Sequence, residues 1–225
     1  MLQFFGMALK RNMTRDEMVA FIDSELLPQA KLEIQNWIRP KKRQGGYFVT
    51  VRQILCMVDF LGAAYWGYPL SERKPPRPKK PMQIARSEKA IKFITTFFEP
   101  KQTYQLSLVE KLHNMYRHGL VHLYQPKILK YINNSTLEWF FYKGKRIWLR
   151  KSADTNQGKI VFKKIDHLKI IPRGTSRKRY HLAVCIDALY EDFENAVLKY
   201  RDKLSKTKSL QRKWRTTVNA ICKPQ

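Results

Sequence analysis

The N-terminal part of the chain carries apolar residues at the spacing of an amphipathic helix. Thr14 to Glu17 has the form of a capping box, in which each end residue satisfies a backbone N–H of the other. Apolar residues follow at intervals of three and four, namely Met18, Phe21, Ile22, Leu26 and Leu27. This pattern predicts a helix that begins after Thr14, is open to a kink at Pro28, and ends at Ile38-Arg39-Pro40.

A nearly continuous apolar segment runs from Tyr47 to Trp66 and predicts a central, buried helix. Asp59 is the one acidic residue within it. Because a buried carboxylate needs a partner, Asp59 is expected on the polar edge of this helix or paired with a cation. Arg52 and Arg117 are the candidate cations, and the apolar pattern favours the polar edge.

Two further helices are predicted before the middle of the chain. Ser87 to Phe98 is amphipathic and is closed by Pro100. A second apolar stripe leads up to Arg117 and consists of Leu106, Leu108, Leu112, Met115 and Tyr116. Arg117 is therefore expected on, or just after, the end of a helix.

The pattern changes to that of strands from Leu137 onward. The segment LEWFFYKGKRIWL predicts a hairpin that turns at Lys143-Gly144-Lys145, and further strands are predicted within 159–171 and 181–186. Asp187 is expected to cap a last helix that runs through Leu189 to Leu204. Beyond Ser205 the sequence indicates a basic tail, either a frayed helix or a disordered segment.

These elements predict a mainly α fold: a helical bundle with a small antiparallel β-hairpin or sheet near the C-terminal third, α+β overall. Hydrophobic residues make up 44% of 225 residues, enough for one core. We expect the bundle to span residues 1–205, with the β insertion at about 137–186 and the basic tail at 206–225.

The charge balance indicates a polyanionic partner. The chain has 44 Lys and Arg against 18 Asp and Glu, a net charge of +26. Nucleic acid is the expected partner, and 12% aromatic residues favour RNA or single strands, although most of these rings are expected in the core. Solvated basic faces are the alternative. The residues predicted to contact nucleic acid are Lys127, Lys143, Lys145, Arg146, Arg177, Lys178 and Arg179.

Other features narrow the class of protein. Cys56, Cys185 and Cys222 are scattered, so neither a disulfide framework nor a thiolate zinc site is expected. No secretion signal is visible, and no apolar run is expected to reach the ~20 residues of a membrane span. We therefore predict a cytoplasmic, unanchored protein. A Gly-rich phosphate loop is not visible either, and no cofactor or metal is expected.

The candidate chemistry lies in Arg117-His118-Gly119-Leu120-Val121-His122. An arginine fork fits phosphate oxygens, and imidazoles exchange protons near neutrality. In a regular helix, the step from Arg117 to His122 rotates by about 140°, which separates the two side chains. Their convergence needs a kink or helix end at Gly119, or two copies of the motif across a two-fold axis.

Two other interpretations of this segment remain open. His118 and His122 are spaced like a two-histidine metal site, but no acidic third ligand is nearby. Alternatively, His122 is a buried structural residue and Arg117 forms a salt bridge with Glu110 or Asp59.

The segment from Tyr116 to Lys127 resembles the signature of HEPN domains, the higher-eukaryote-and-prokaryote nucleotide-binding helical bundles. Their motif has an Arg, usually a polar residue next, and a His four to six positions after the Arg; Arg117, His118 and His122 match it. Gly45 to Tyr65 is similar to the long helix that precedes the motif. Leu123 departs from the pattern, because an acidic residue often stands there.

The resemblance implies a metal-independent endoribonuclease that works as a homodimer, with the motifs of both subunits in one cleft. His122 is then the general base, Arg117 stabilises phosphate charge, and His118 orients the phosphate or shares proton transfer. The alternative is a non-catalytic HEPN-like dimer that binds RNA or a protein. A toxin or defence module with an antitoxin or other protein partner is a further expectation.

Overall fold

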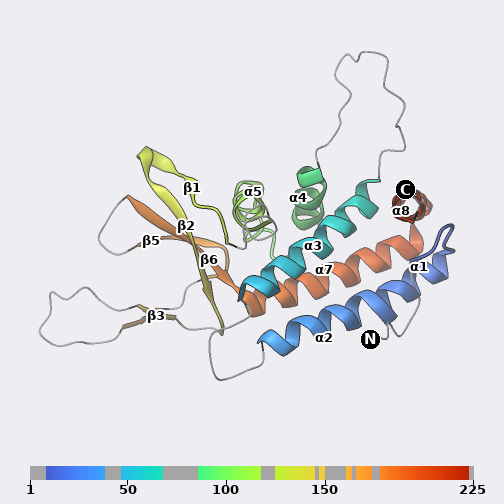
Figure 1. Ribbon diagram of the computed structural model, residues 1–225, viewed down its shortest axis with the longest axis horizontal. Helices are drawn as coiled ribbons and strands as arrows, with labels where there is room; N and C mark the ends of the chain where they lie inside the picture. The colour runs from blue at the N-terminus through green and yellow to red at the C-terminus, as the bar shows by residue number, and fades with distance from the viewer. Residues whose placement is uncertain are drawn as a thin grey trace, which may run out of the picture.

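The computed structural model describes residues 9–38, 47–67, 86–117, 125–144, 147–149, 161–163, 166–173 and 178–222. Long helices lie side by side, and a small sheet lies at one end of them (Figure 1). The mainly helical α+β class predicted from the sequence is confirmed.

The first helical run has the predicted start and end. It consists of α1 (Arg15–Phe21), a π-helix (Ile22–Leu26) and α2 (Leu27–Ile38). The capping box is present: the Glu17 N–H donates to Thr14 Oγ1, and the Thr14 N–H donates to Glu17 Oε2. The wide π turn comes just before Pro28, which has no N–H for the helical ladder.

The central helix α3 (Tyr47–Trp66) has the predicted bounds. It packs against α2, against α4 (Arg86–Phe97), and against α7 (Ile186–Lys206) and α8 (Lys208–Ile221). By length and composition alone, α3 is apolar enough to cross a membrane, so the expectation that no run reaches that size was wrong. Its contacts with four helices make it the core helix of the described part of the chain.

The C-terminal segment is a folded helix. Residues 208–221 form α8, and its Trp214 is fully buried against Tyr200 of α7, with 6.2 Å between ring centroids. The prediction of a frayed or disordered basic tail was therefore wrong over this range. The prediction failed because the segment's charge concealed an apolar stripe that includes Leu210, Trp214 and Val218.

The main sheet has the strand order β1-β2-β6-β5. Its strands are β1 (Leu129–Lys130), β2 (Thr136–Tyr142), β5 (Lys169–Pro172) and β6 (Arg179–Cys185). β2 and β6 are parallel, whereas β1–β2 and β5–β6 are antiparallel. The sheet is thus mixed rather than purely antiparallel as predicted.

The predicted hairpin around Lys143-Gly144-Lys145 was also wrong. The strand after the turn, β3 (Ile147–Leu149), pairs with β4 (Val161–Lys163) in a separate sheet. Gly144 has φ of 75°, and its N–H donates to Asp187 Oδ2 at 2.6 Å. Asp187 therefore holds this turn. It was predicted to be the N-cap of α7, but the N-cap is Cys185.

One face of the main sheet packs on the helices. Trp139 and Phe141 of β2 contact Phe48 of α3, with ring centroids 5.0 and 5.4 Å apart. Tyr116 contacts Phe141 at 5.1 Å. This inner face fixes the sheet against the part of the chain that leads into the Arg117 segment.

Candidate nucleic-acid site

The structure places Arg117 in a helical segment. α5 (Leu106–Leu112) continues into a π-helix (His113–Arg117), in which residue i bonds to i+5. Residues 118–124 lie outside the described part of the chain, so the predicted helix end near Arg117 stays a prediction. Of Arg117 only the backbone is described, and His118 and His122 lie outside the described residues.

The described residues on either side of the motif meet at one hydrogen bond. The Lys127 N–H donates to the carbonyl oxygen of Met115 at 2.8 Å. Beside this bond, the buried hydroxyl of Tyr116 donates to the Leu182 carbonyl of β6 at 3.4 Å. The π-helix, the chain at Lys127 and the sheet are thereby tied together.

Asp59 of α3 lies beside this junction. Its Oδ1 is 3.5 Å from Nε2 of His113 in the π-helix, and the exposed side-chain fractions are 26% for Asp59 and 2% for His113. The prediction of a polar-edge position agrees with this partial exposure. His113 was missed, because the apolar stripe around it predicts only a core helix and gives no signal for a buried imidazole.

The predicted nucleic-acid residues do not form one patch within the described structure. Lys127 is exposed five residues after His122, and Lys178 and Arg179 are exposed at the start of β6. Lys143 follows the far end of β2, and its Nζ lies 5.0 Å from the Tyr47 ring centroid. Because β2 and β6 run parallel, Lys143 and Arg179 are separated by about 20 Å along the sheet. Lys145, Arg146 and Arg177 lie outside the described residues.

Arg179 belongs to a charged cluster that sequence reasoning missed. Glu138 of β2 bonds Arg173 and lies 3.8 Å from Nε of Arg179 and 3.7 Å from Nε2 of His181. The pKa of His181 is lowered by burial and by Arg173, while Glu138 acts in the opposite direction. The alternation of β2 points Glu138 away from the core, but only the unforeseen pairing of β2 with β6 assembles the cluster.

A second missed group is a buried polar relay. The Cys185 N–H donates to Nδ1 of His167, so Nε2 carries the proton and lies 3.1 Å from the Tyr104 hydroxyl. That hydroxyl donates to Oδ2 of Asp192 at 2.7 Å. Burial lowers the pKa of His167 to about 3, so its ring is neutral at physiological pH. The relay joins the loop before α5 to the sheet and α7.

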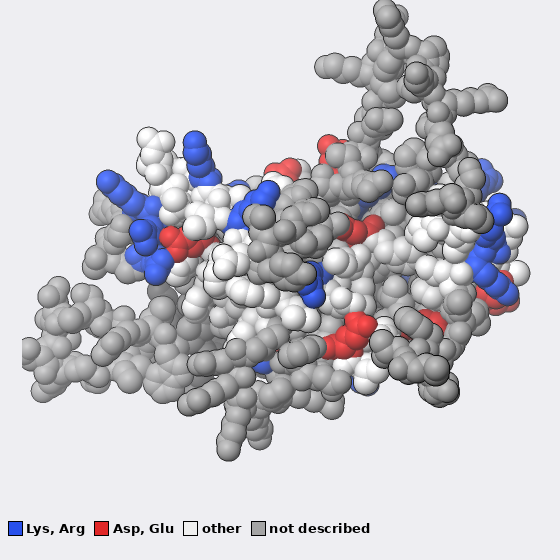
Figure 2. Space-filling view, viewed as in Figure 1, with Lys and Arg blue, Asp and Glu red and all other residues white. Residues whose placement is uncertain are grey.

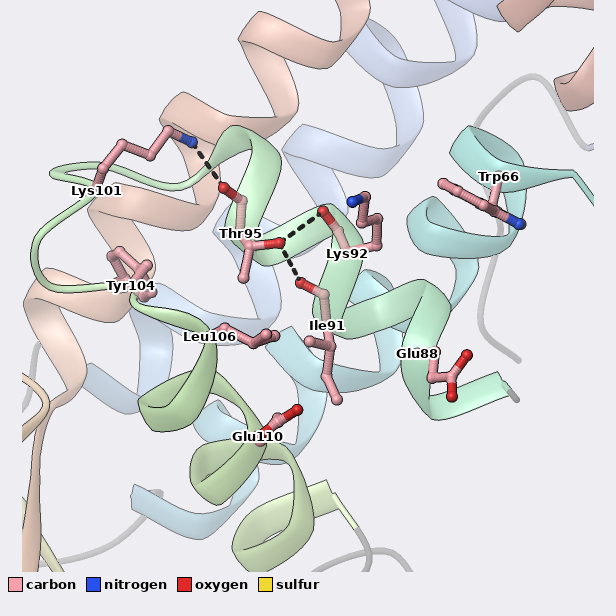
Figure 3. Close-up of a pocket in the computed structure, with 9 residues that line it drawn as sticks. All are labelled: Trp66, Glu88, Ile91, Lys92, Thr95, Lys101, Tyr104, Leu106 and Glu110. Carbon is pink, nitrogen blue, oxygen red and sulfur yellow. Dashed lines mark hydrogen bonds between the residues drawn. The ribbon is translucent and has the colours of Figure 1, made fainter. Parts of the chain in front are cut away.

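A hollow of about 520 Å³ lies between α4 and α5 (Figure 3). Lys101 closes one end of it, with its Nζ 3.0 Å from the Thr95 carbonyl. Glu88 and Glu110 offset Lys92 and Lys101 in the lining, so the charge is mixed. None of the predicted site residues lines this hollow.

No protein-family model, curated protein or solved structure matches this chain. Assignment of its function therefore depends on its own residues and their geometry.

Proposed function

We propose that this protein is a HEPN-like, metal-independent endoribonuclease whose site contains Arg117, His118 and His122. The observation that carries the proposal is the hydrogen bond from the Lys127 N–H to the Met115 carbonyl oxygen at 2.8 Å, which joins the described residues on either side of the motif. A single regular helix would carry residue 127 about 18 Å from residue 115, so this bond fits the break between Arg117 and His122 that their convergence requires. The π-helix His113–Arg117 includes the first motif residue, and π turns occur frequently at functional sites.

The burial of Met115 and Tyr116 supports the same proposal, because both are fully buried and the Tyr116 hydroxyl donates to the Leu182 carbonyl. The sequence between Met115 and Lys127 contains the one arginine and two histidines of the motif, so the residues that flank it are held on the core. Rigid positioning matters because acid–base groups must lie within hydrogen-bond distance of the atoms that exchange protons.

The proposed reaction needs only groups in this chain and the RNA itself. His122 accepts the proton of a ribose 2′-OH, and the 2′ oxygen then forms a bond to the adjacent phosphorus. Arg117 stabilises the charge on the non-bridging oxygens as the P–O5′ bond breaks. The departing 5′ oxygen takes up a proton, a role open to His118. The products are a 2′,3′-cyclic phosphate and a 5′-hydroxyl.

The test is cleavage of end-labelled RNA in EDTA by the purified protein and by Arg117→Ala and His122→Ala. We expect each variant to lose activity by about 100-fold or more, in line with losses of general-base and charge-stabilising groups. Arg212→Ala, on the exposed side of α8, is the control for loss of a cation and should keep full activity. DNA of the same sequence should remain intact.

Activity that requires a divalent metal, or that persists in His122→Ala, would overturn the enzyme proposal. The remaining candidate is then a non-catalytic HEPN-like protein that binds RNA or a protein partner. The net charge of +26 favours this second function independently of the motif, because released counterions alone give affinity for RNA. In that case RNA binding survives both substitutions.

The proposal includes a homodimer in which the motifs of both subunits line one cleft, in the cytoplasm, with an antitoxin or other protein as its regulator. Such a dimer places His122 of one subunit near Arg117 of the other. Mixing Arg117→Ala with His122→Ala subunits tests this arrangement. A shared cleft restores part of the activity in mixed dimers, whereas independent sites leave the mixture inactive.

A further inference from the structure

The outer face of the main sheet, turned away from the helices, carries a row of cations across its strands. Strand pairing aligns Lys130 with Thr136, and Thr136 with Arg179. Arg173 joins the same end, because its N–H donates to the Arg179 carbonyl oxygen at 2.9 Å. The side chains of Arg173 and Arg179 are 49% and 58% exposed. Figure 2 shows Lys and Arg side chains gathered over this end of the molecule.

Three aromatic rings stack along the same face, directly below the row. His181 and Phe140 are 5.6 Å apart with an interplanar angle of 10°, and Phe140 and Tyr142 are 6.1 Å apart at 23°. Phe140 and His181 are partly exposed, whereas Tyr142 is buried. We call these rings the aromatic ladder. Its accessible end therefore lies next to the arginines.

Glu138 gives this surface a fixed geometry. Its carboxylate holds Arg173 and lies near Arg179 and His181, which restrains three side chains that would otherwise sample many rotamers. One acid against Lys130, Arg173 and Arg179 leaves the surface cationic. Restrained arginines beside stacked rings match a ligand with alternating phosphates and bases.

The surface also lies close to the described residues that flank the motif. Lys127 is bonded to Met115, and Lys130 follows three residues later. Three residues span at most about 11 Å, so the row begins within that backbone distance of the residues that precede Arg117. A strand of a few nucleotides could therefore contact both.

We propose that the outer sheet face binds unpaired RNA, with phosphates on Lys130, Arg173 and Arg179 and a base against the Phe140–His181 end of the ladder. This deepens the proposed RNA-directed function and depends on it. It specifies single-stranded substrate, because bases inside a duplex are stacked on one another and present no free ring face.

The test measures anisotropy of a labelled single strand of about twelve 2′-O-methyl nucleotides, which cannot be cleaved by 2′-OH attack. Phe140→Leu should weaken binding about fivefold or more, the loss expected for one stacked base. Arg173→Gln/Arg179→Gln should reduce the slope of log affinity against log salt by about 1.4, or 0.7 per lost phosphate contact. The matched control, Lys208→Gln/Arg212→Gln, removes two exposed α8 cations and should leave the slope nearly unchanged.

Equal effects of the two double variants, or equal affinity for the single strand and its duplex, would overturn the proposal. If Phe140→Leu fails to fold by its melting curve, photo-cross-linking of wild type with a 4-thiouridine strand decides. Cross-links at residues 138–142 or 179–183 support the face, and cross-links confined elsewhere reject it. The probe resists cleavage, so the two proposals fail separately. If only the nuclease proposal is wrong, natural RNA stays intact while the probe still binds.

Discussion

At the scale of single residues, Gly62 shows how tightly the core helices meet. A Cβ at this position would lie 2.6 Å from the backbone carbonyl oxygen of Lys89 in α4. Backbone atoms cannot turn aside as a flexible side chain can. Glycine is therefore retained inside α3 in spite of its poor helix propensity.

In Gly62→Ala, helix propensity and the clash with α4 change the free energy of unfolding in opposite directions. Helix propensity alone predicts a gain of about 1 kcal/mol, whereas the clash predicts a loss of about 1–3 kcal/mol that outweighs it. We expect a net decrease in the free energy of unfolding, measured by urea denaturation. Ala63→Gly, one position along, calibrates the propensity effect. A stabilised Gly62→Ala protein would show that α3 and α4 are farther apart.

His167 is expected to make the stability of the protein depend on pH. Its pKa is about 3 in the folded protein, because of burial, against about 6.5 in the unfolded chain. As pH falls below 6.5, the unfolded chain takes up a proton that the folded protein does not. Its contribution to stability is present above pH 6.5 and is lost progressively towards pH 3.

The free energy of unfolding falls by up to about 1.4 kcal/mol per pH unit. The urea midpoint should therefore decline between about pH 6 and 5. His167→Asn keeps an acceptor for the Cys185 N–H but cannot titrate, so its stability should change less with pH. Asp192, whose pKa is raised by burial, is present in both proteins and cancels in the comparison. Identical pH profiles would contradict a buried neutral His167.

At the scale of elements, α8 shows that a strongly basic segment can be a packed part of the core. Thr217 of α8 donates to the Ala63 carbonyl of α3 at 2.9 Å, and Trp214 is enclosed by aromatic rings that include Phe21 and Phe60. The helix thus covers α1, α3 and α7 together. Lys208 and Arg212 lie on its exposed side, whereas Lys213 lies over the Tyr65 and Trp66 rings.

Trp214→Ala should lower the free energy of unfolding by about 3–5 kcal/mol, the usual cost of removing a buried tryptophan. Calorimetry or urea denaturation measures it. Arg212→Gln, on the exposed side of the same helix, should change stability by less than about 0.5 kcal/mol. Similar values for both variants would mean that α8 is not part of the core.

Helices were predictable from sequence where a local pattern determines them. The bounds of α3 follow from one apolar run, and the start of α1 follows from the capping box at Thr14. The pairing of β2 with β6 was not predictable, because it joins segments far apart in the chain. The same limit applies to the Glu138 cluster, which needs that pairing, and to the His167 relay, which joins Tyr104, Cys185 and Asp192 from separate parts of the chain.

At the scale of the whole molecule, the charge predicts how RNA binding responds to salt. Each phosphate contacted by a single strand contributes about 0.7 to the slope of log affinity against log salt. A fourfold rise in salt should therefore weaken binding roughly 2.6-fold per contact. Titrations at several salt concentrations give the number of contacts. A flat response would show that the net charge of +26 does not drive binding.

The positions of Arg117 and its neighbours show what sequence could indicate of the site. Spacing predicts a break at Gly119, which lies outside the described residues, whereas the π-helix His113–Arg117 includes the first motif residue and had no signal in the spacing. His113 beside Asp59 had no sequence signal, because its neighbours are apolar core residues. The roles of His118 and His122 remain predictions of the resemblance and the proposed chemistry.

Asn12 and Asn219 are joined twice, since the Asn12 N–H donates to Asn219 Oδ1 at 2.8 Å and Asn219 Nδ2 donates to Asn12 Oδ1 at 2.9 Å. These bonds connect residues 207 positions apart. During synthesis on the ribosome, the contacts of α1 with α8 cannot form until α8 has been made. Contacts of such long range slow folding, so we expect the apolar surface of α1 that α8 covers to stay exposed in the partly made chain.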